Sequence, residues 1–439
     1  MGSNSICAIT LRPYCLFSYE PEERLRGGVA EGQRQAARLS RANALASEVL
    51  IDKKKKIKNK KKKKKKKKKN CRLGPSIESP LRPTFLPLNL LALHLKSTMT
   101  GRTSFPVPPI PLTSHCDRAA EIHATYVNDA ETVWFDVDSQ AYALSLSATQ
   151  QPEFSPELEE LEAKNAEMMR KDKMFIARDL KDVPMLAYFP QVLEPTTVAA
   201  TYCALNEYVT TAPFNREHDA TLPKESRRDQ RHPFSQKLFE LFGPRHSIRH
   251  CGMWHATGHP HERPSVSKDA IRTATLVHAT TVLLSHLVLL TVELSILFSA
   301  FDVPAWSAAR WFIAALNHFN PDFGICRAGE FECWAHRALL FNLETHAQRD
   351  LRDDRNGYAV ISVFGSFVGG DFVVPSLGLK FSFQPGDVIF IKGQMLQHFI
   401  TPWSGETDKG ERFCITHFRH QSLVDSVAKA SQAKSSIDN

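Results

Sequence analysis

Three side chains near the end of the chain have the types and the order that a mononuclear metal site requires. Asp350 and His398 are separated by a β-rich run from Tyr358 to Ile391, and Arg412 follows them. Imidazole and carboxylate ligands on one face of Fe(II) leave positions open for oxygen and for a bidentate oxo-acid. A guanidinium pairs well with a second carboxylate on that acid. The order therefore predicts a non-haem iron site with an anionic co-substrate.

Short strands must position these side chains. Gly, Pro and Asp residues divide the region into predicted strands at Leu339–Leu343, Tyr358–Phe364, Phe372–Pro375, Leu379–Phe383, Val388–Ile391 and Arg412–Phe418. Short strands with regular turn punctuation are typical of a sandwich or a jelly-roll barrel. We therefore predict an α+β fold, with a double-stranded β-helix (jelly-roll) core and supporting helices on its N-terminal side.

Two helix starts are marked by capping residues. Ser155 precedes a proline and acidic residues, which predicts a scaffold helix that runs to about Asp172. Asp302 precedes Pro304 in the same way, and the helix that follows has an apolar face made of Trp306, Ala309, Phe312, Ile313 and Leu316. We expect this second helix to pack against the sheet.

The segment 274–301 is unusually apolar and contains neither Lys nor Arg. Its length would allow it to span a bilayer, which needs about 20 residues, but His278, His286 and Glu293 would be costly there. Three interpretations stay open: a buried helix, a translated intron that is foreign to the native fold, or a membrane span.

Composition and charge indicate how the chain is divided into regions. A lysine tract at 53–69 contributes 15 positive charges to a net charge of +9, so the remainder is mildly acidic. We predict a disordered or low-complexity region at 1–112, mixed helical support at 113–300, the jelly-roll core at 302–425 and a flexible tail at 426–439. Nine scattered cysteines without a Cys-x-x-Cys pair indicate reduced thiols and a nuclear or cytoplasmic location.

The region from His336 to Leu423 resembles a known group of enzymes. The motifs that carry the resemblance are Asn342-Leu-Glu-Thr-His, Gly369-Gly-Asp, Leu377-Gly-Leu-Lys, Gln384-Pro-Gly-Asp-Val-Ile-Phe, Leu396-Gln-His-Phe-Ile and Glu411-Arg-Phe-Cys-Ile-Thr-His-Phe. Their order and spacing are similar to those of the Fe(II)/2-oxoglutarate-dependent dioxygenases, in particular the fungal branch of the TET/J-base-binding oxygenases. The resemblance implies decarboxylation of 2-oxoglutarate and hydroxylation of a C–H bond. In this branch the expected target is the 5-methyl group of cytosine or thymine in DNA.

The resemblance also implies roles for single residues. Asp350 matches the carboxylate ligand of Fe(II), His398 matches the distal histidine ligand, and Arg412 matches the arginine that pairs with the far carboxylate of 2-oxoglutarate. The family's motif is His-x-Asp, but Gln348 stands at the histidine position here. A neutral amide is a poor substitute for imidazole on Fe(II). His346, four residues before Asp350, completes the predicted ligand set if the segment bends.

Two functions follow from these assignments. The first is a dioxygenase that acts on a flipped nucleobase. Its stacking candidates are Tyr358, Phe364, Phe367 and Trp403, each of which equally fits a position in the core. The alternative is a catalytically impaired homologue that acts as a binding or scaffold protein because Gln348 replaces a ligand. The folded part lacks an obvious basic stripe, so the lysine tract would supply nonspecific attraction to DNA. A membrane-attached protein built on 274–301 is a third, less favoured interpretation.

Overall fold

The computed structural model describes residues 112–146, 155–212, 236–255, 262–406 and 410–438. The chain divides into two units, Met1–Phe105 and Pro106–Asn439, and every element below belongs to the second. The predicted low-complexity region with its lysine tract lies outside the described residues, apart from Leu112 at its end.

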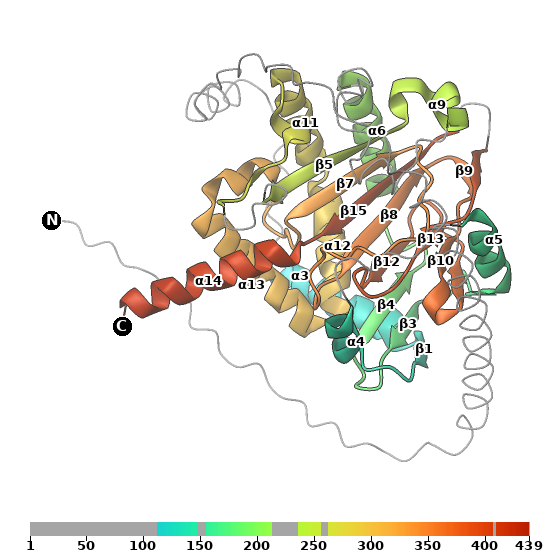
Figure 1. The fold of residues 1–439 in the computed structure, drawn as a ribbon, viewed down its shortest axis with the longest axis horizontal. Helices are drawn as coiled ribbons and strands as arrows, with labels where there is room; N and C mark the ends of the chain where they lie inside the picture. Colours follow the sequence, from blue (N-terminus) through green and yellow to red (C-terminus); the bar gives the residue numbers. More distant parts are fainter. Residues whose placement is uncertain (1–111, 147–154, 213–235, 256–261, 407–409, 439) are drawn as a thin grey trace, which may run out of the picture. The chain divides into compact units, whose positions relative to one another are not determined.

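Among the described residues, nine strands form one large sheet (Figure 1). In spatial order they are β1 (Glu131–Trp134), β3 (Phe175–Arg178), β4 (Pro184–Phe189), β12 (Val388–Ile391), β8 (Ala359–Gly365), β15 (Arg412–Phe418), β7 (His336–Phe341), β5 (Ser247–Trp254) and β6 (Ser265–Val266). The β1–β3 pair is parallel and the other neighbours are antiparallel. In the antiparallel centre, alternate residues of each strand point to opposite faces.

A smaller sheet packs against one of these faces. Its strands, in spatial order, are β13 (Phe399–Ile400), β10 (Phe372–Val374), β11 (Leu379–Phe381) and β2 (Glu167–Met168). A further pair consists of β14 (Trp403–Gly405) and β9 (Phe367–Gly369). Phe372 and Phe381 of the small sheet share one buried cluster with Ile361 and Ile389 of the large sheet. The space between the two sheets is therefore a packed apolar layer.

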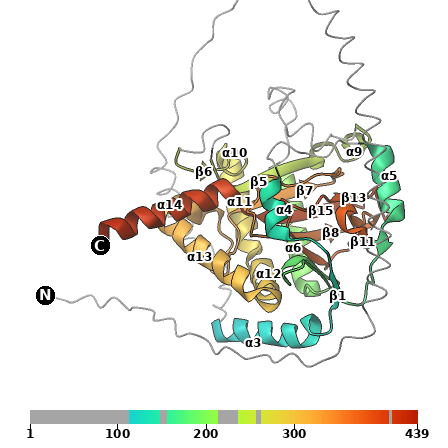
Figure 2. The same cartoon turned by 60° about the horizontal axis from the view of Figure 1, so that its bottom comes forward.

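Helices cover the other face of the large sheet, where α6 and α12 lie behind the central strands (Figure 1). The helices are α3 (Leu112–Ile122), α4 (Ser139–Ser145), α5 (Pro156–Asn165), α6 (Pro195–Thr211), α9 (Gln236–Phe242), α10 (Lys268–Ile271), α11 (Ala274–His286), α12 (Val288–Phe301), α13 (Val303–Phe319) and α14 (Gln421–Asp438). Short helical turns are η1 (His123–Val127), η2 (Gly243–Arg245), η3 (Pro321–Cys326) and η4 (Pro375–Leu377). Figure 2 shows α13 and α14 side by side at one end of this layer.

The predicted helix starts are confirmed by their caps. The Ser155 side chain accepts a hydrogen bond from Leu158 N at 3.3 Å, and the Asp302 side chain accepts one from Ala305 N at 3.0 Å. The first helix ends at Asn165 rather than near Asp172, because the chain then turns into β2 and pairs with β11. The α13 face is buried as predicted, with Trp306 partly buried.

The combination of helices and large sheets agrees with the predicted α+β class. The core is not confined to 302–425, however, because β1, β3, β4, β5 and β6 come from the region predicted as helical support. The physical reason is that β12 and β7 each have a second edge to be paired, and β4 and β5 pair with those edges. The prediction of a flexible tail at 426–439 also differs from the structure. Residues 421–438 form α14, and Leu423 and Val427 on this helix are buried.

The apolar segment 274–301 forms α11 and α12, which pack into the main core. Phe298 is 1% exposed and contacts Phe301, Trp334 and Phe390 through ring–ring packing. Of the helices that the structure describes, none is by itself long and apolar enough to cross a membrane. The pair α11 and α12 meets that requirement together, by length and composition, across a 52° bend. Of the three interpretations of segment 274–301, the packing of α11 and α12 agrees with the buried helix.

Substituting alanine for Phe298 is expected to destabilise the protein by about 3–5 kcal/mol, because it leaves a cavity in a closely packed aromatic cluster. The measurement is urea unfolding followed by circular dichroism. Leu289 lies on the same helix and is 44% exposed, so Leu289→Ala should change stability by less than about 0.5 kcal/mol. Equal, small effects of the two variants would mean that α12 is not part of the folded core.

Candidate functional site

The predicted acid and distant imidazole come together. His398 Nε2 lies 3.6 Å from Asp350 Oδ2. His398 is almost fully buried and stacks on Phe372, with ring centroids 5.5 Å apart. Its Nδ1 lies 3.1 Å from the Leu396 carbonyl oxygen, which can accept the ring proton. That tautomer leaves the Nε2 lone pair directed toward Asp350, as in a histidine ligand oriented by a backbone carbonyl.

Asp350 lies very close to Gly393. Asp350 N donates to the Gly393 carbonyl at 2.8 Å. A Cβ atom at position 393 would lie 2.9 Å from Asp350 Oδ2, so a larger residue there would displace the carboxylate from its present position. Gln348, on the same loop as Asp350, forms an antiparallel bridge with His398, and the two N–O distances are 3.1 and 3.0 Å. The loop thus brings position 348 beside the distal histidine.

Arg412 is a buried cation whose side chain lacks a full set of partners. Its residue is 4% exposed, and its Nε and Nη2 have no hydrogen-bond partner among the described residues. The guanidinium lies over the Phe367 ring, 5.2 Å from the centroid. Burial lowers the pKa of this guanidinium. Because an unpaired buried charge is costly, this arrangement suits an anion that is bound during function.

Arg412 and His398 face the same layer. Arg412 packs on Phe367 and His398 stacks on Phe372, and both phenylalanines belong to the buried cluster between the two sheets. Gly370 has φ +72°, and a Cβ atom there would lie 3.0 Å from Arg412 Nε. A side chain at position 370 would therefore press against the buried guanidinium, and glycine avoids that contact.

A polar network holds the start of β15 in place. Asn342 is fully buried with φ +54°. Its Oδ1 accepts from Arg412 N at 2.9 Å, and its Nδ2 donates to Glu411 Oε1 at 3.2 Å. Glu411 in turn accepts from Arg245 Nε at 2.6 Å. Glu411 is therefore paired with Arg245, as expected if it points away from Arg412.

Replacing Asn342 by alanine should cost about 2–3 kcal/mol, because three side-chain hydrogen bonds, with Arg412 N, Glu411 Oε1 and the Arg245 carbonyl, are lost and alanine is strained at positive φ. Chemical denaturation measures this. Asn342→Asp keeps the acceptor for Arg412 N and should recover part of the loss. A loss below about 0.5 kcal/mol, the usual range of a neutral surface change, would contradict the network.

His346 is not brought into the site. Its Nδ1 lies 3.2 Å from Glu159 Oε2 on α5, and Glu159 Oε1 also accepts a hydrogen bond from Ala347 N. Within the described residues, no three His, Cys, Asp or Glu side chains come together as metal ligands would. The bend that His346 would need is absent because the backbone bridge at Gln348 and the contact with α5 hold the segment apart from Asp350.

The predicted stacking candidates divide between the two faces. Phe367 and Trp403 contact each other and lie near Arg412. Tyr358 and Phe364 instead belong to the core on the helix side of the sheet, so the core alternative is confirmed for these two. In β8 the residues that face the other sheet are Ala359, Ile361 and Val363. Successive residues of a strand point to opposite faces, so a shift of one residue moves a side chain from one face to the other.

Sequence reasoning missed an aromatic cluster on the site-facing side of the large sheet, formed by Trp254, His336, Phe418 and His420. Ring centroids lie 4.5 Å apart for Trp254–His336 and 5.1 Å apart for His336–Phe418. Phe418 shares a face with Arg412, six residues earlier on β15. The only sequence signal was alternation along β15, which cannot show that β5 and β7 lie beside it.

The aromatic cluster is linked to the loop that carries Asp350. Asp353 N donates to Asp350 O at 2.8 Å, and Asp353 forms a backbone bridge with His420. Burial, followed by the charges of Asp350 and Asp354, raises the pKa of Asp353 well above its usual range. Burial also lowers the pKa of His336 to about 3, so this ring is neutral at pH 7. Trp254 and His420 are only partly buried.

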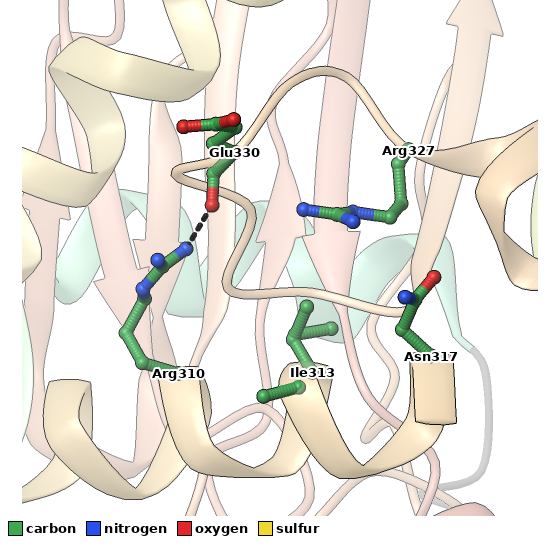
Figure 3. A pocket seen from close by; sticks show the side chains of 6 residues that line it. Arg310, Ile313, Asn317, Arg327 and Glu330 are labelled. Atoms are coloured by element: carbon green, nitrogen blue, oxygen red, sulfur yellow. Dashed lines mark hydrogen bonds between the residues drawn. The ribbon is translucent and has the colours of Figure 1, made fainter. Parts of the chain in front are cut away.

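A separate pocket of about 260 Å³ lies beside α13 (Figure 3). Arg310 Nη1 donates to the Glu330 backbone oxygen and fastens the 327–330 loop to the helix. The lining residues are Arg310, Ile313, Ala314, Asn317, Arg327 and Glu330. None of the candidate site residues lines this pocket.

The side chains present fit Fe(II) and 2-oxoglutarate in part. Asp350 and His398 supply a carboxylate and an imidazole at the separation of neighbouring ligands, and Arg412 supplies a buried cation whose Nε and Nη2 lack partners in the described part of the chain. Among the described residues, no second imidazole joins them, although the ligand set implied by the resemblance includes one.

Comparisons with known proteins agree with the resemblance. Residues 337–421 match the family model Tet_JBP, described as the oxygenase domain of the 2OGFeDO superfamily. The matched segment begins on β7 and includes Asp350, His398 and Arg412. The resemblance to TET/J-base-binding 2-oxoglutarate oxygenases is thereby confirmed. No curated protein is significantly similar in sequence.

Solved structures give weaker matches. NgTET1 in complex with 5mC DNA is 13% identical with a TM-score of 0.43, and the alignment covers 72% of this chain and 92% of that one. A BsmA homologue from Methylobium petroleophilum is 12% identical with a TM-score of 0.26, covering 54% and 89%. IDO from Bacillus thuringiensis is 11% identical with a TM-score of 0.21, covering 50% and 95%.

Proposed function

We propose that the protein is a 2-oxoglutarate-dependent oxygenase with a double-stranded β-helix core. Asp350 and His398 would hold Fe(II), and Arg412 would bind the far carboxylate of 2-oxoglutarate. In the chemistry that these groups would supply, O2 is the oxidant: one of its atoms enters succinate as 2-oxoglutarate loses CO2, and the other hydroxylates a C–H bond of the substrate. The two facing sheets and the matched oxygenase segment support this assignment.

The observation that carries the proposal is the guanidinium of Arg412. A structural arginine at this burial would be paired with a carboxylate, as the fully buried Arg337 is with Glu332. Arg412 lies over the Phe367 ring, and its Nε and Nη2 have no hydrogen-bond partner among the residues that the structure describes. A bound dicarboxylate would satisfy those groups, with its other end directed toward the Asp350–His398 pair on the same layer.

We further propose that the substrate is a methylated pyrimidine base in DNA. The aromatic cluster lies on the same face as Arg412, and the partly exposed rings of Trp254 and His420 offer surfaces for stacking a flipped base. The lysine tract would add nonspecific attraction to the phosphates.

The test is succinate formation from 2-oxoglutarate with Fe(II), oxygen and DNA that contains 5-methylcytosine or thymine, combined with mass spectrometry of the bases. Oxidised methyl groups in the wild type, and their loss in His398→Ala, are expected. Succinate without base oxidation would reject the DNA substrate and keep the oxygenase. No succinate under any of these conditions would reject the oxygenase.

One observation favours a second candidate. The two-ligand arrangement, with Gln348 in place of a histidine and His346 bound to Glu159, is what an impaired homologue would have. Such a protein would bind 2-oxoglutarate or DNA without turnover, as a binding or scaffold protein. Binding of methylated DNA in the absence of succinate formation would support it.

A further inference from the structure

We infer that Glu159 sets the number of protein ligands at the metal site by holding His346 away from Asp350 and His398. This inference rests on the proposed function. It assigns a positioning role to α5, an element outside the segment that matches the oxygenase family.

One carboxylate makes both contacts with the loop. Glu159 Oε2 lies 3.2 Å from His346 Nδ1, and Oε1 accepts from Ala347 N. Both side chains are largely removed from solvent, with 24% of His346 and 14% of Glu159 exposed. A carboxylate that engages a ring and the next backbone amide fixes the direction of that ring, because both oxygens are committed.

The position of Glu159 does not depend on the loop that it holds. The α5 helix leads into β2, which pairs with β11 at Leu379↔Glu167 and Lys380↔Met168. Lys380 Nζ also donates to the Ala163 carbonyl at 3.0 Å. Both views show α5 beside the small sheet (Figures 1 and 2). The carboxylate is therefore presented by the scaffold.

The other side of the loop is held by the distal histidine. Gln348 is bridged to His398 by two backbone hydrogen bonds, two residues after the His346 contact. The short segment 346–348 is thus fixed between α5 and β13. His346 is the nearest histidine before Asp350 in the sequence, so its capture by Glu159 leaves the carboxylate and His398 as the protein ligands.

Co(II) binding tests this inference, because Co(II) accepts the same ligands and its visible absorption responds to an added imidazole. Glu159→Ala is expected to bind Co(II) at least tenfold more tightly, about 1.4 kcal/mol, with a changed spectrum. His346→Ala should bind Co(II) as the wild type does, and Glu159→Ala/His346→Ala should return to the wild-type value. Glu160 is the exposed neighbour on α5, and Glu160→Ala is the matched control.

Two results would overturn the inference. If His346→Ala alone weakens Co(II) binding tenfold at an unchanged melting temperature, His346 is already a ligand. If Glu159→Ala shows no gain that depends on His346, the contact does not control ligation. Should Glu159→Ala lower the melting temperature, Glu159→Gln keeps an acceptor for Ala347 N without the negative charge, and the same criteria apply. A third result would contradict the proposed function instead of this inference: Co(II) binding that does not change in Asp350→Ala and His398→Ala.

Discussion

Gln348→His is expected to raise the affinity for Fe(II) or Co(II) at least tenfold, about 1.4 kcal/mol, and to increase succinate formation. The backbone bridge places residue 348 beside His398, and residue 348 stands two positions before Asp350. A histidine there would supply the second imidazole of the family's ligand set, where the amide of glutamine is a weak donor to the metal. Metal titration by calorimetry measures the change.

The control for this variant is Gln397→His. It adds a histidine next to His398 in the sequence but outside the Gln348–His398 bridge, and it should leave metal affinity unchanged. If Gln348→His binds metal no better than Gln397→His, the position assigned to the missing ligand is wrong. A gain in affinity without a gain in turnover would place the defect elsewhere than in ligation.

Arg412→Met is expected to separate stability from co-substrate binding. The substitution removes a buried, incompletely paired charge and keeps an apolar side chain of similar length, so the protein without ligand should become about 1–3 kcal/mol more stable. Affinity for 2-oxoglutarate should fall about 100-fold, or about 2.7 kcal/mol. Urea unfolding and calorimetric titration measure the two quantities.

Arg245→Met is the matched control for Arg412→Met. Arg245 is paired with Glu411, so its loss leaves a partly buried carboxylate without its cation and should destabilise the protein. A loss of stability in Arg412→Met similar to that in Arg245→Met would show that Arg412 is a structural residue. Unchanged 2-oxoglutarate affinity in Arg412→Met would have the same meaning.

The local chemistry of the fold could be predicted because it is encoded by neighbours in the sequence. The caps at Ser155 and Asp302, the alternation of β15 and the turns around Gly369 and Gly386 need only short-range rules. The membership of the large sheet could not be predicted in this way. Which distant strands pair with β12 and β7 depends on tertiary packing rather than on local propensity.

The candidate site shows the same division. The positions of Asp350, His398 and Arg412 followed from motif order, and the structure brings the first two within 3.6 Å. The separation of His346 from them could not be anticipated, since Glu159 lies 187 residues earlier in the chain. The aromatic cluster escaped prediction for a related reason, because Trp254 reaches it from β5, outside the region of resemblance.

Titration of 2-oxoglutarate with and without Mn(II) tests the central claim most directly, because metal and co-substrate must share one site. We predict that Mn(II) tightens 2-oxoglutarate binding at least tenfold, that 2-oxoglutarate tightens Mn(II) binding by the same factor, and that this coupling is lost in both Asp350→Ala and Arg412→Met. Binding of the two ligands without coupling, or coupling that survives either substitution, would contradict the account.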